Sequence, residues 1–219
     1  MTPIPSPPLE DLPDTFPVFP LPGALLLPGG KLPLNIFEPR YLALTEDALA
    51  NGRIFGMIQP DRTQPDTAHG PALFHVGCLG RLVSFSETDD GRYLITLRGL
   101  VRFRVDEELS ERRGYRRVRA KLAPFAADLV PVDGFTLDRK ALLDALRKYF
   151  VHHGIDANWD AIKQIDDASL VTTLSMVCPF EAAEKQALLE AADATARGQA
   201  LLTLLWIDQH DAPDHAKAS

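Results

Sequence analysis

The chain has 219 residues, of which 46% are hydrophobic and 24% are charged, a composition typical of globular proteins. Its net charge of −7 argues against nucleic acid or an anionic membrane as a partner, except at a local basic patch. No apolar run reaches the roughly 18 to 20 residues of a membrane span, and the N-terminus has no signal-peptide pattern. We therefore expect a cytoplasmic protein of one large or two small domains, with no membrane partner.

Both ends of the chain are predicted to be disordered tails. Residues 1–14 contain five prolines among Ser, Thr and acidic residues, with too little apolar surface to offset the entropy cost of ordering. Residues 209–219 have the same character. Between the tails, residues 15–130 are predicted to form a strand-rich lobe and residues 131–208 a helical lobe.

Short strands broken by Gly, Pro and Asp are predicted throughout the first lobe. They cover residues 16–19, 25–27, 54–59, 77–86, 93–97, 101–105 and 115–122. Residues 88–91, Thr-Asp-Asp-Gly, are predicted to form a hairpin turn. One helix interrupts the strands, beginning at Pro39 and ending at Asn51-Gly52. So many short strands around one helix indicate a small closed or nearly closed barrel.

From Phe135 onward, the spacing of the apolar residues becomes helical. The first helix carries Leu142, Leu146 and Tyr149 on one side and is predicted to end at Gly154. Further helices are predicted at residues 168–178, 181–191 and 194–207. Asp167 is expected to cap the first of these three, and Pro179 to end it. The four helices are predicted to pack as a C-terminal bundle.

Two segments resemble a known family. Residues 16–41 read FPVFPLPGALLLPGGKLPLNIFEPRY, and residues 170–189 read LVTTLSMVCPFEAAEKQALL. These segments resemble the Lon protease N-terminal, substrate-binding domain in their prolines, the FEPRY helix start, LSM, Pro-Phe and EKQ-LL. One departure is Asn35, at a position where that family commonly has His. The resemblance covers residues 16–207. It implies an α+β fold, in which a PUA-like, mostly antiparallel β-barrel with one inserted helix precedes the C-terminal α-helical bundle.

The resemblance also implies non-catalytic recognition of unfolded or partner polypeptide, with a separate protease or an adaptor complex as a further partner. A full Lon protease continues into an ATPase and a Ser-Lys peptidase, but no phosphate-binding glycine loop or nucleophile elbow occurs in this sequence. We therefore expect no enzymatic activity and no cofactor. A small hydrolase is an alternative that no nucleophile–base pair supports.

Candidate peptide-binding residues gather at the start of the predicted first helix and on nearby strands. They are Phe37, Glu38, Arg40, Tyr41, Arg98 and Arg102. Arg40, beside the proline-rich residues 32–34, is positioned to line a shallow groove, and Phe37 and Tyr41 offer apolar contacts. The structural alternative is that Glu38 stabilises the helix N-terminus and Tyr41 belongs to the core.

A local excess of positive charge runs through residues 98–121, with nine basic and four acidic residues. Alternation with apolar residues predicts one basic face on two strands. Its members are Arg102, Arg104, Arg117, Arg119 and Lys121. The favoured interpretation is a solvated face, partly neutralised by residues 106–111 in a connecting loop. The alternative is RNA binding, which the lack of interleaved aromatic residues disfavours.

The sequence predicts no metal site and no reactive cysteine. None of the usual ligand spacings is present, and His152 and His153 are adjacent residues that should point about 100° apart on a helix. This separation argues against a shared ion. Cys78 and Cys178 lie in apolar surroundings and are predicted to be buried free thiols.

Overall fold

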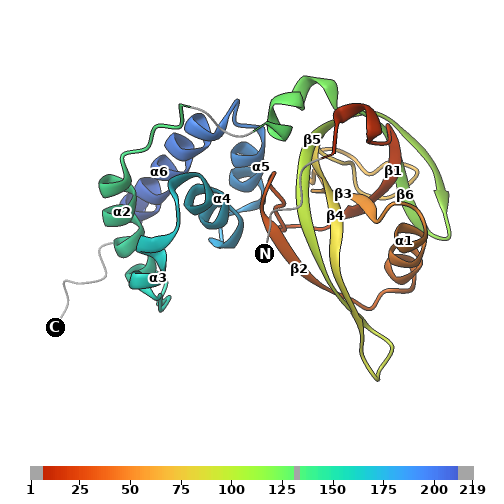
Figure 1. Ribbon diagram of the computed structural model, residues 1–219, viewed down its shortest axis with the longest axis horizontal. Coiled ribbons are helices and arrows are strands. Elements are labelled where there is room, and N and C mark those ends of the chain that lie inside the picture. Colours follow the sequence, from red (N-terminus) through yellow and green to blue (C-terminus); the bar gives the residue numbers. More distant parts are fainter. Residues whose placement is uncertain (1–6, 131–133, 212–219) are drawn as a thin grey trace.

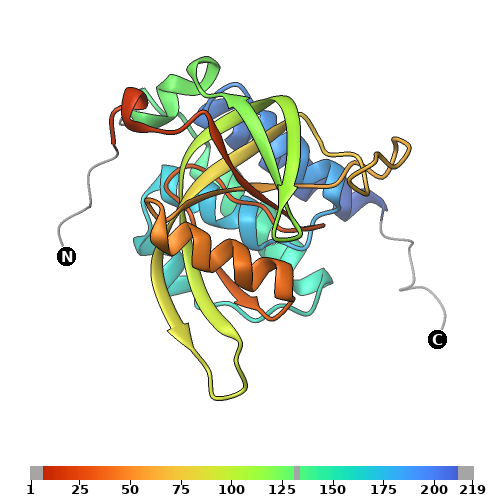
Figure 2. The same ribbon diagram turned by 90° about the vertical axis from the view of Figure 1, so that its right-hand side faces the viewer.

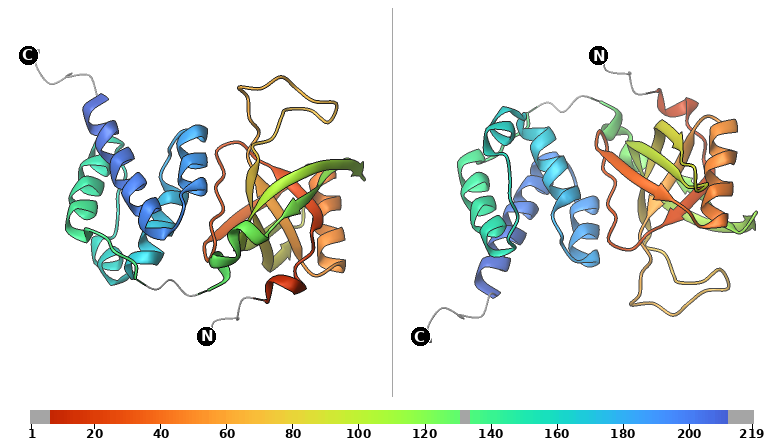
Figure 3. Two further views of the ribbon diagram at one scale, coloured as in Figure 1. Left: turned by 90° about the horizontal axis from the view of Figure 1, so that it is seen from above. Right: turned by 90° about the horizontal axis from the view of Figure 1, so that it is seen from below.

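The computed structural model describes residues 7–130 and 134–211, with side chains as far as Asp208. Figure 1 shows a strand-rich part that carries one helix and a helical part beside it. Helix α5 (Ala182–Glu190) is the helix that lies against the strands. The views in Figure 3 show the same arrangement from above and below.

Six strands form one sheet in the order β2-β5-β4-β3-β1-β6. Their bounds are β1 (Thr15–Pro20), β2 (Lys31–Ile36), β3 (Ile54–Ile58), β4 (Val76–Glu87), β5 (Tyr93–Arg112) and β6 (Tyr115–Lys121). β6 also pairs with β5, so five strands form a closed circuit of pairings and β2 is left at an edge. Only β1 and β3 pair in parallel among the described strands.

The strand prediction was wrong in three places. Residues 25–27 are buried but form no strand, because an apolar run indicates burial without fixing the backbone conformation. β2 was missed because it contains Pro33, which an edge strand tolerates where its missing N–H faces away from the neighbour. Residues 93–97 and 101–105 belong to one strand through Gly99, where a Cβ would come within 2.0 Å of the Leu27 carbonyl oxygen.

The predicted inserted helix is α1 (Pro39–Ala50), with Pro39 in its first turn as expected. It buries Tyr41, Leu44 and Ala48 against the strands, and Figure 2 shows it lying across them. The predicted hairpin turn is also present between β4 and β5. The Gly91 amide donates to the Thr88 carbonyl at 2.9 Å, and Gly91 has the positive φ of +77° that this turn requires.

The helical part contains one helix that the sequence did not predict. Its helices are α2 (Arg139–His152), α3 (Trp159–Gln164), α4 (Asp167–Val177), α5 and α6 (Ala194–Asp211). α3 is too short to show a helical period and is identified by its cap, where the Asn158 side chain accepts from the Ala161 amide. α4 is capped by Asp166 rather than the predicted Asp167, since the Asp166 side chain accepts from the Ser169 amide.

Ordered structure extends into both predicted tails. A 3₁₀ helix, η1 (Leu9–Asp11), precedes β1, and Leu12 is buried against the strand core. Leu9 and Leu12 supply apolar surface that the high proline content obscured. At the other end, α6 continues past residue 207 to Asp211. Residues 1–6 and 212–219 of the predicted tails lie outside the described residues, as do residues 131–133 at the predicted lobe boundary.

Two hydrophobic clusters hold the chain together. One lies among the strands and includes Phe16, Leu79 and Phe103. The Phe103 ring fills space beside Gly77, where a Cβ would approach it to 2.4 Å. The second cluster joins strand residues such as Leu97 to helical residues such as Leu188, so the core continues from one part into the other. The two predicted lobes therefore share apolar contacts, and their division at residue 130 stays a prediction.

Arg102 links the two parts and is not on the predicted basic face. Its side chain is 4% exposed, and it pairs with Asp128 of η2 (Ala123–Leu129) through two hydrogen bonds of 2.9 Å. It also donates to the carbonyls of Leu189, Ala191 and Ala192 at the end of α5. The assignment of Arg102 to a peptide-binding or nucleic-acid face was wrong, because strand alternation cannot foresee that another element will cover this side.

Other polar contacts involve α5, one with α6 and two with the strand-rich part. Arg197 donates to the Leu188 carbonyl at 2.8 Å, and burial lowers the pKa of its guanidinium to about 10, with Arg102 adding a smaller lowering. Lys185 donates to the Gly23 carbonyl at 2.7 Å, and Gln186 donates to the Val76 carbonyl at 3.0 Å. The EKQ-LL motif thus supplies both polar and apolar contacts to the strand-rich part.

Replacing Arg102 should destabilise the protein severely. Arg102→Met leaves the Asp128 carboxylate, whose side chain is only 10% exposed, without its guanidinium partner. Breaking such a pair typically costs about 3 to 5 kcal/mol of unfolding free energy. Arg104→Met on the same strand is the matched control, and it should change stability by no more than about 0.5 kcal/mol because Arg104 is exposed. Urea unfolding followed by circular dichroism measures both. Equal effects would contradict the structural role of Arg102.

Candidate functional site

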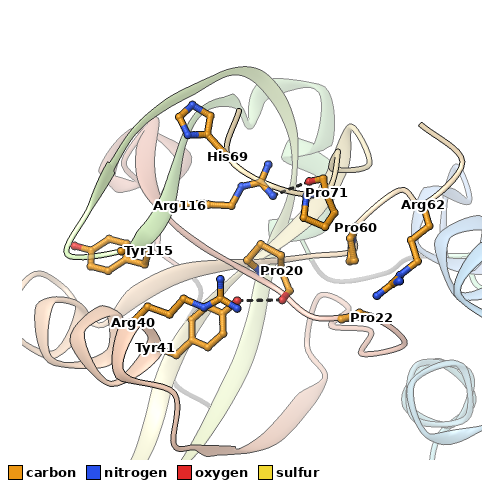
Figure 4. A pocket seen from close by; sticks show the side chains of 11 residues that line it. Pro20, Pro22, Arg40, Tyr41, Pro60, Arg62, His69, Pro71, Tyr115 and Arg116 are labelled. Carbon is orange, nitrogen blue, oxygen red and sulfur yellow. Dashed lines mark hydrogen bonds between the residues drawn. The ribbon is translucent and has the colours of Figure 1, made fainter. Parts of the chain in front are cut away.

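A pocket of about 170 Å³ lies where α1, the β5–β6 turn and the segment after β3 meet. Figure 4 shows its lining. The lining residues are Pro20, Pro22, Arg40, Tyr41, Pro60, Arg62, His69, Pro71, Gly114, Tyr115 and Arg116. Residues from four separate segments therefore converge on one small volume.

The walls of the pocket are apolar and constrained. Four prolines line it, and each has a fixed φ and no N–H to be satisfied. Tyr41 is buried, stacks on Phe19 with 3.9 Å between ring centroids, and donates from its hydroxyl to the Pro20 carbonyl at 3.5 Å. Burial raises the pKa of Tyr41, so its phenol stays neutral at physiological pH. Tyr41 is therefore a fixed wall.

The three arginines at the pocket differ in how far they are engaged. Arg116 is buried, pairs with Glu108 through two nitrogens and donates to the Pro71 carbonyl at 2.7 Å, so its role is structural. Arg40 is half exposed and lies 2.8 Å from Glu38. Arg62 is exposed and makes no hydrogen bond or ion pair with any residue that the structure describes. In the view of Figure 4, Arg40 and Arg62 lie on either side of Pro20.

A network at the end of α1 sets the shape of the pocket. The Asp47 carboxylate accepts from the Tyr115 hydroxyl at 2.5 Å and from Arg113 at 2.9 Å. The Tyr115 hydrogen bond, followed by Arg113, lowers the pKa of Asp47. Burial, followed by the hydrogen bond to Asp47, raises the pKa of Tyr115 to about 12. The network thus joins the helix that carries Arg40 to the strand that carries Arg116.

The pocket is suited to non-covalent binding of one side chain. A cavity of about 150 Å³ is known to hold a benzene ring, so a volume of this order accommodates one large apolar side chain. Arg40 and Arg62 place positive charge at its edge, where the exposed Glu38 pairs with Arg40. An aromatic or aliphatic side chain with an acidic neighbour matches this combination best.

The structure brings together only part of the predicted peptide-binding set. Arg40 and Tyr41 line the pocket, and Glu38 reaches its edge through Arg40. Phe37 is 62% exposed outside the lining, with the Arg92 guanidinium 5.8 Å from its ring centroid. Arg98 lies opposite Lys31 in the β2–β5 pairing, away from the lining residues.

Several pocket residues were not predicted from the sequence. The segment between β3 and β4 has no clear periodic pattern. It carries four of the lining residues, Pro60, Arg62, His69 and Pro71. Figure 2 shows this segment extending from the strands. The signal for Pro20 and Pro22 was present, because both belong to the PVFPLP motif. The others become neighbours only through folding.

The alternative nucleic-acid face is partly neutralised by cross-strand ion pairs. Arg119 pairs with Glu107, and the Lys121 ammonium lies 2.5 Å from Asp106. These acids belong to β5 rather than the predicted connecting loop, so they lie beside the basic residues of β6. Within the described part of the chain, Arg104 and Arg117 have no recorded ion pair. This arrangement supports the interpretation of a solvated face.

Two further sequence predictions have clear outcomes. Cys78 and Cys178 are buried free thiols, as predicted, and burial raises the pKa of Cys178 to about 12. The expectation that His152 and His153 cannot converge was wrong, because both imidazoles contact the carboxylate of Asp208. They do so through different ring nitrogens, so the 100° rotation between adjacent helical residues does not keep them apart. In the described residues, no helix has the length and apolarity needed to cross a membrane.

Comparison with known families identifies the class of protein. The model of the ATP-dependent protease La (LON) substrate-binding domain matches residues 15–206, so the chain belongs to this family. It is 28% identical over 200 residues to Lon protease 2 of Myxococcus xanthus, covering 90% of this chain and 24% of that protein. It is 25% identical over 199 residues to Lon protease 2 of Thermus thermophilus, covering 89% and 24%. The chain thus spans 24% of either relative.

Solved structures agree with this assignment. The Lon N-terminal domain protein from Xanthomonas campestris superimposes with a TM-score of 0.60 at 25% identity, covering 86% of this chain and 97% of that one. The N-terminal domain of the Mycobacterium avium complex Lon protease gives a TM-score of 0.57 at 20% identity, covering 90% and 99%. The mixed sheet and helices described above are therefore those of the Lon N-terminal domain fold.

Removing the Asp47 carboxylate should give a loss of stability that depends on pH. The pKa of Asp47 is lowered by folding, so its stabilisation is full above its ordinary value of 3.8 and is lost as pH falls through the lower native value. Asp47→Asn should lower the unfolding free energy at neutral pH by roughly 1 to 2 kcal/mol. The difference from the unmodified protein should shrink below about pH 4. Urea unfolding across this pH range measures it, and a constant difference would contradict the assignment.

Proposed function

We propose that this chain is a non-catalytic module that binds extended polypeptide, with the pocket beside α1 receiving one side chain of the bound segment. The family to which the chain belongs is described as a substrate-binding domain, and this supports the general kind of partner. The observation that carries the proposal is the pocket itself, with proline and tyrosine walls beside the exposed guanidinium of Arg62, which has no partner among the described residues.

Binding would combine a modest apolar contribution with charge pairing. Burying one large apolar side chain contributes about 1.5 to 3 kcal/mol, and an exposed ion pair to Arg62 or Arg40 adds about 0.2 to 1 kcal/mol. The ligand loses conformational freedom on binding, which offsets part of this gain. Affinity for one short segment should therefore be weak, and longer polypeptides would gain by contacting more of the surface.

The finer features expected from the sequence fit within this proposal. We take the closed circuit of strands to be the PUA-like barrel and helices α2 to α6 to be the C-terminal bundle that the family resemblance implies. A separate protease or an adaptor complex remains a proposed partner, and the cytoplasmic location remains a prediction. RNA binding is not favoured, because Glu107 and Asp106 already pair with Arg119 and Lys121.

Reversing the charge of Arg62 should weaken the binding of acidic peptides. Two fluorescein-labelled 12-residue peptides would be compared by anisotropy, both containing Phe, one with Asp and the other with Lys at the flanking positions. The Asp peptide should bind more tightly, and Arg62→Glu should weaken it roughly 3- to 10-fold because an attractive charge becomes repulsive. The Lys peptide should not lose affinity.

Arg117→Glu is the matched control, since it makes the same charge change on the face of β6 outside the pocket. It should leave the affinity for the Asp peptide within about twofold, apart from a small effect of net charge that salt screens. Equal losses in Arg62→Glu and Arg117→Glu would indicate a general electrostatic effect and overturn the pocket assignment. A loss only in Arg117→Glu would place the binding surface on the strand face.

A further inference from the structure

We propose that His152, His153 and Asp208 form a binding site for a transition-metal ion such as Zn²⁺. The site lies in the helical part, at the ends of α2 and α6, away from the pocket and independent of the function proposed for it. Figure 1 shows α2 and α6 side by side. One ligand atom from each of the three residues can be chosen so that all lie within 4.8 Å of one another.

Both histidines are directed at one carboxylate. The Nδ1 atom of His152 lies 3.1 Å from Oδ2 of Asp208, and the Nε2 atom of His153 lies 3.0 Å from Oδ1 and 3.1 Å from Oδ2. Ligand atoms around a tetrahedral Zn²⁺ are separated by about 3.3 Å, given bonds of about 2.0 to 2.1 Å. These nitrogen-to-oxygen distances therefore already approach those of a metal centre.

Packing against neighbouring aromatic rings sets the positions of the two imidazoles. The His153 ring lies 4.2 Å from the Tyr149 ring, centroid to centroid, and the His152 and His153 rings meet edge to face at 4.9 Å. Tyr149 is itself buried in the helical core. To bring the ligand nitrogens of the two imidazoles to the spacing found around one ion, the rings need only rotate about χ2. Such rotation is accessible because the χ2 wells of histidine are broad.

The chemistry of the three ligands selects the class of ion. Two neutral imidazoles and one carboxylate suit Zn²⁺, Ni²⁺ or Cu²⁺, whereas Mg²⁺ and Ca²⁺ prefer oxygen ligands. The single negative charge of Asp208 complements a divalent cation. Three protein ligands would leave a fourth position for water. A bound ion would also join the end of α6 to the end of α2 across 56 residues of chain.

Zinc titration of the chelator-treated full chain tests the proposal. Isothermal titration calorimetry with ZnCl₂ near neutral pH should show one ion bound per chain, and MgCl₂ should show no binding. His152→Ala and Asp208→Asn should each weaken Zn²⁺ binding by at least about tenfold, a loss that removal of even an outer partner of a ligand can cause. Absence of Zn²⁺ binding, or unchanged affinity in both variants, would overturn the proposal.

His75→Ala is the matched control, because it removes one exposed histidine of the strand-rich part that lies outside the pocket lining. It should bind Zn²⁺ like the unmodified protein, and an equal loss in this variant would overturn the site. Cobalt provides a second measurement. Co²⁺ added to the unmodified chain should give the intense visible absorption of four-coordinate cobalt, and Asp208→Asn should lose it. A weak, six-coordinate spectrum in the unmodified chain would contradict the proposed geometry.

Discussion

The arrangement of the whole molecule depends on the buried guanidinium of Arg102. It comes from the long strand β5, pairs with Asp128 and donates to three carbonyls at the end of α5. A buried charge is tolerated only when its partners are complete, so the strand, the η2 segment and α5 must occupy these positions together. Arg197 adds a second buried guanidinium at the same helix end. These contacts fix the position of the helices relative to the strands, and the apolar core runs from one into the other.

The pocket beside α1 follows from a different constraint, the closure of the strand circuit. Because β6 pairs with both β1 and β5, the β5–β6 turn is brought against α1, where Asp47 accepts from Tyr115 and Arg113. Arg116 then holds the segment after β3 through the Pro71 carbonyl. What remains open is a volume of one side chain with the exposed guanidinium of Arg62 beside it. Membership of a substrate-binding family gives this geometry its functional interpretation.

The candidate site was only partly predictable, for reasons that individual residues make clear. Arg40 and Tyr41 were found because the FEPRY motif joins a helix start to residues that reach the surface. Arg62 was missed because its segment has no period and no turn signal that fixes its direction. Arg102 was misplaced because alternation along a strand assigns a side chain to a face but does not reveal what covers that face. His152 and His153 were separated on a helical wheel, yet a carboxylate on another helix brings them together.

By itself, the sequence determined most of the helices and strands and the family to which the chain belongs. Local signals sufficed for this, since Pro39 begins a helix, Gly91 permits a turn, and the PVFPLP and EKQ-LL motifs are read directly. Tertiary structure alone decided which charges are buried, which arginines stay exposed and which segments meet at the pocket and at the histidine pair. Those outcomes depend on contacts between residues far apart in the chain, and hydrophobic periodicity carries no information about which distant segment will supply the other half of a contact.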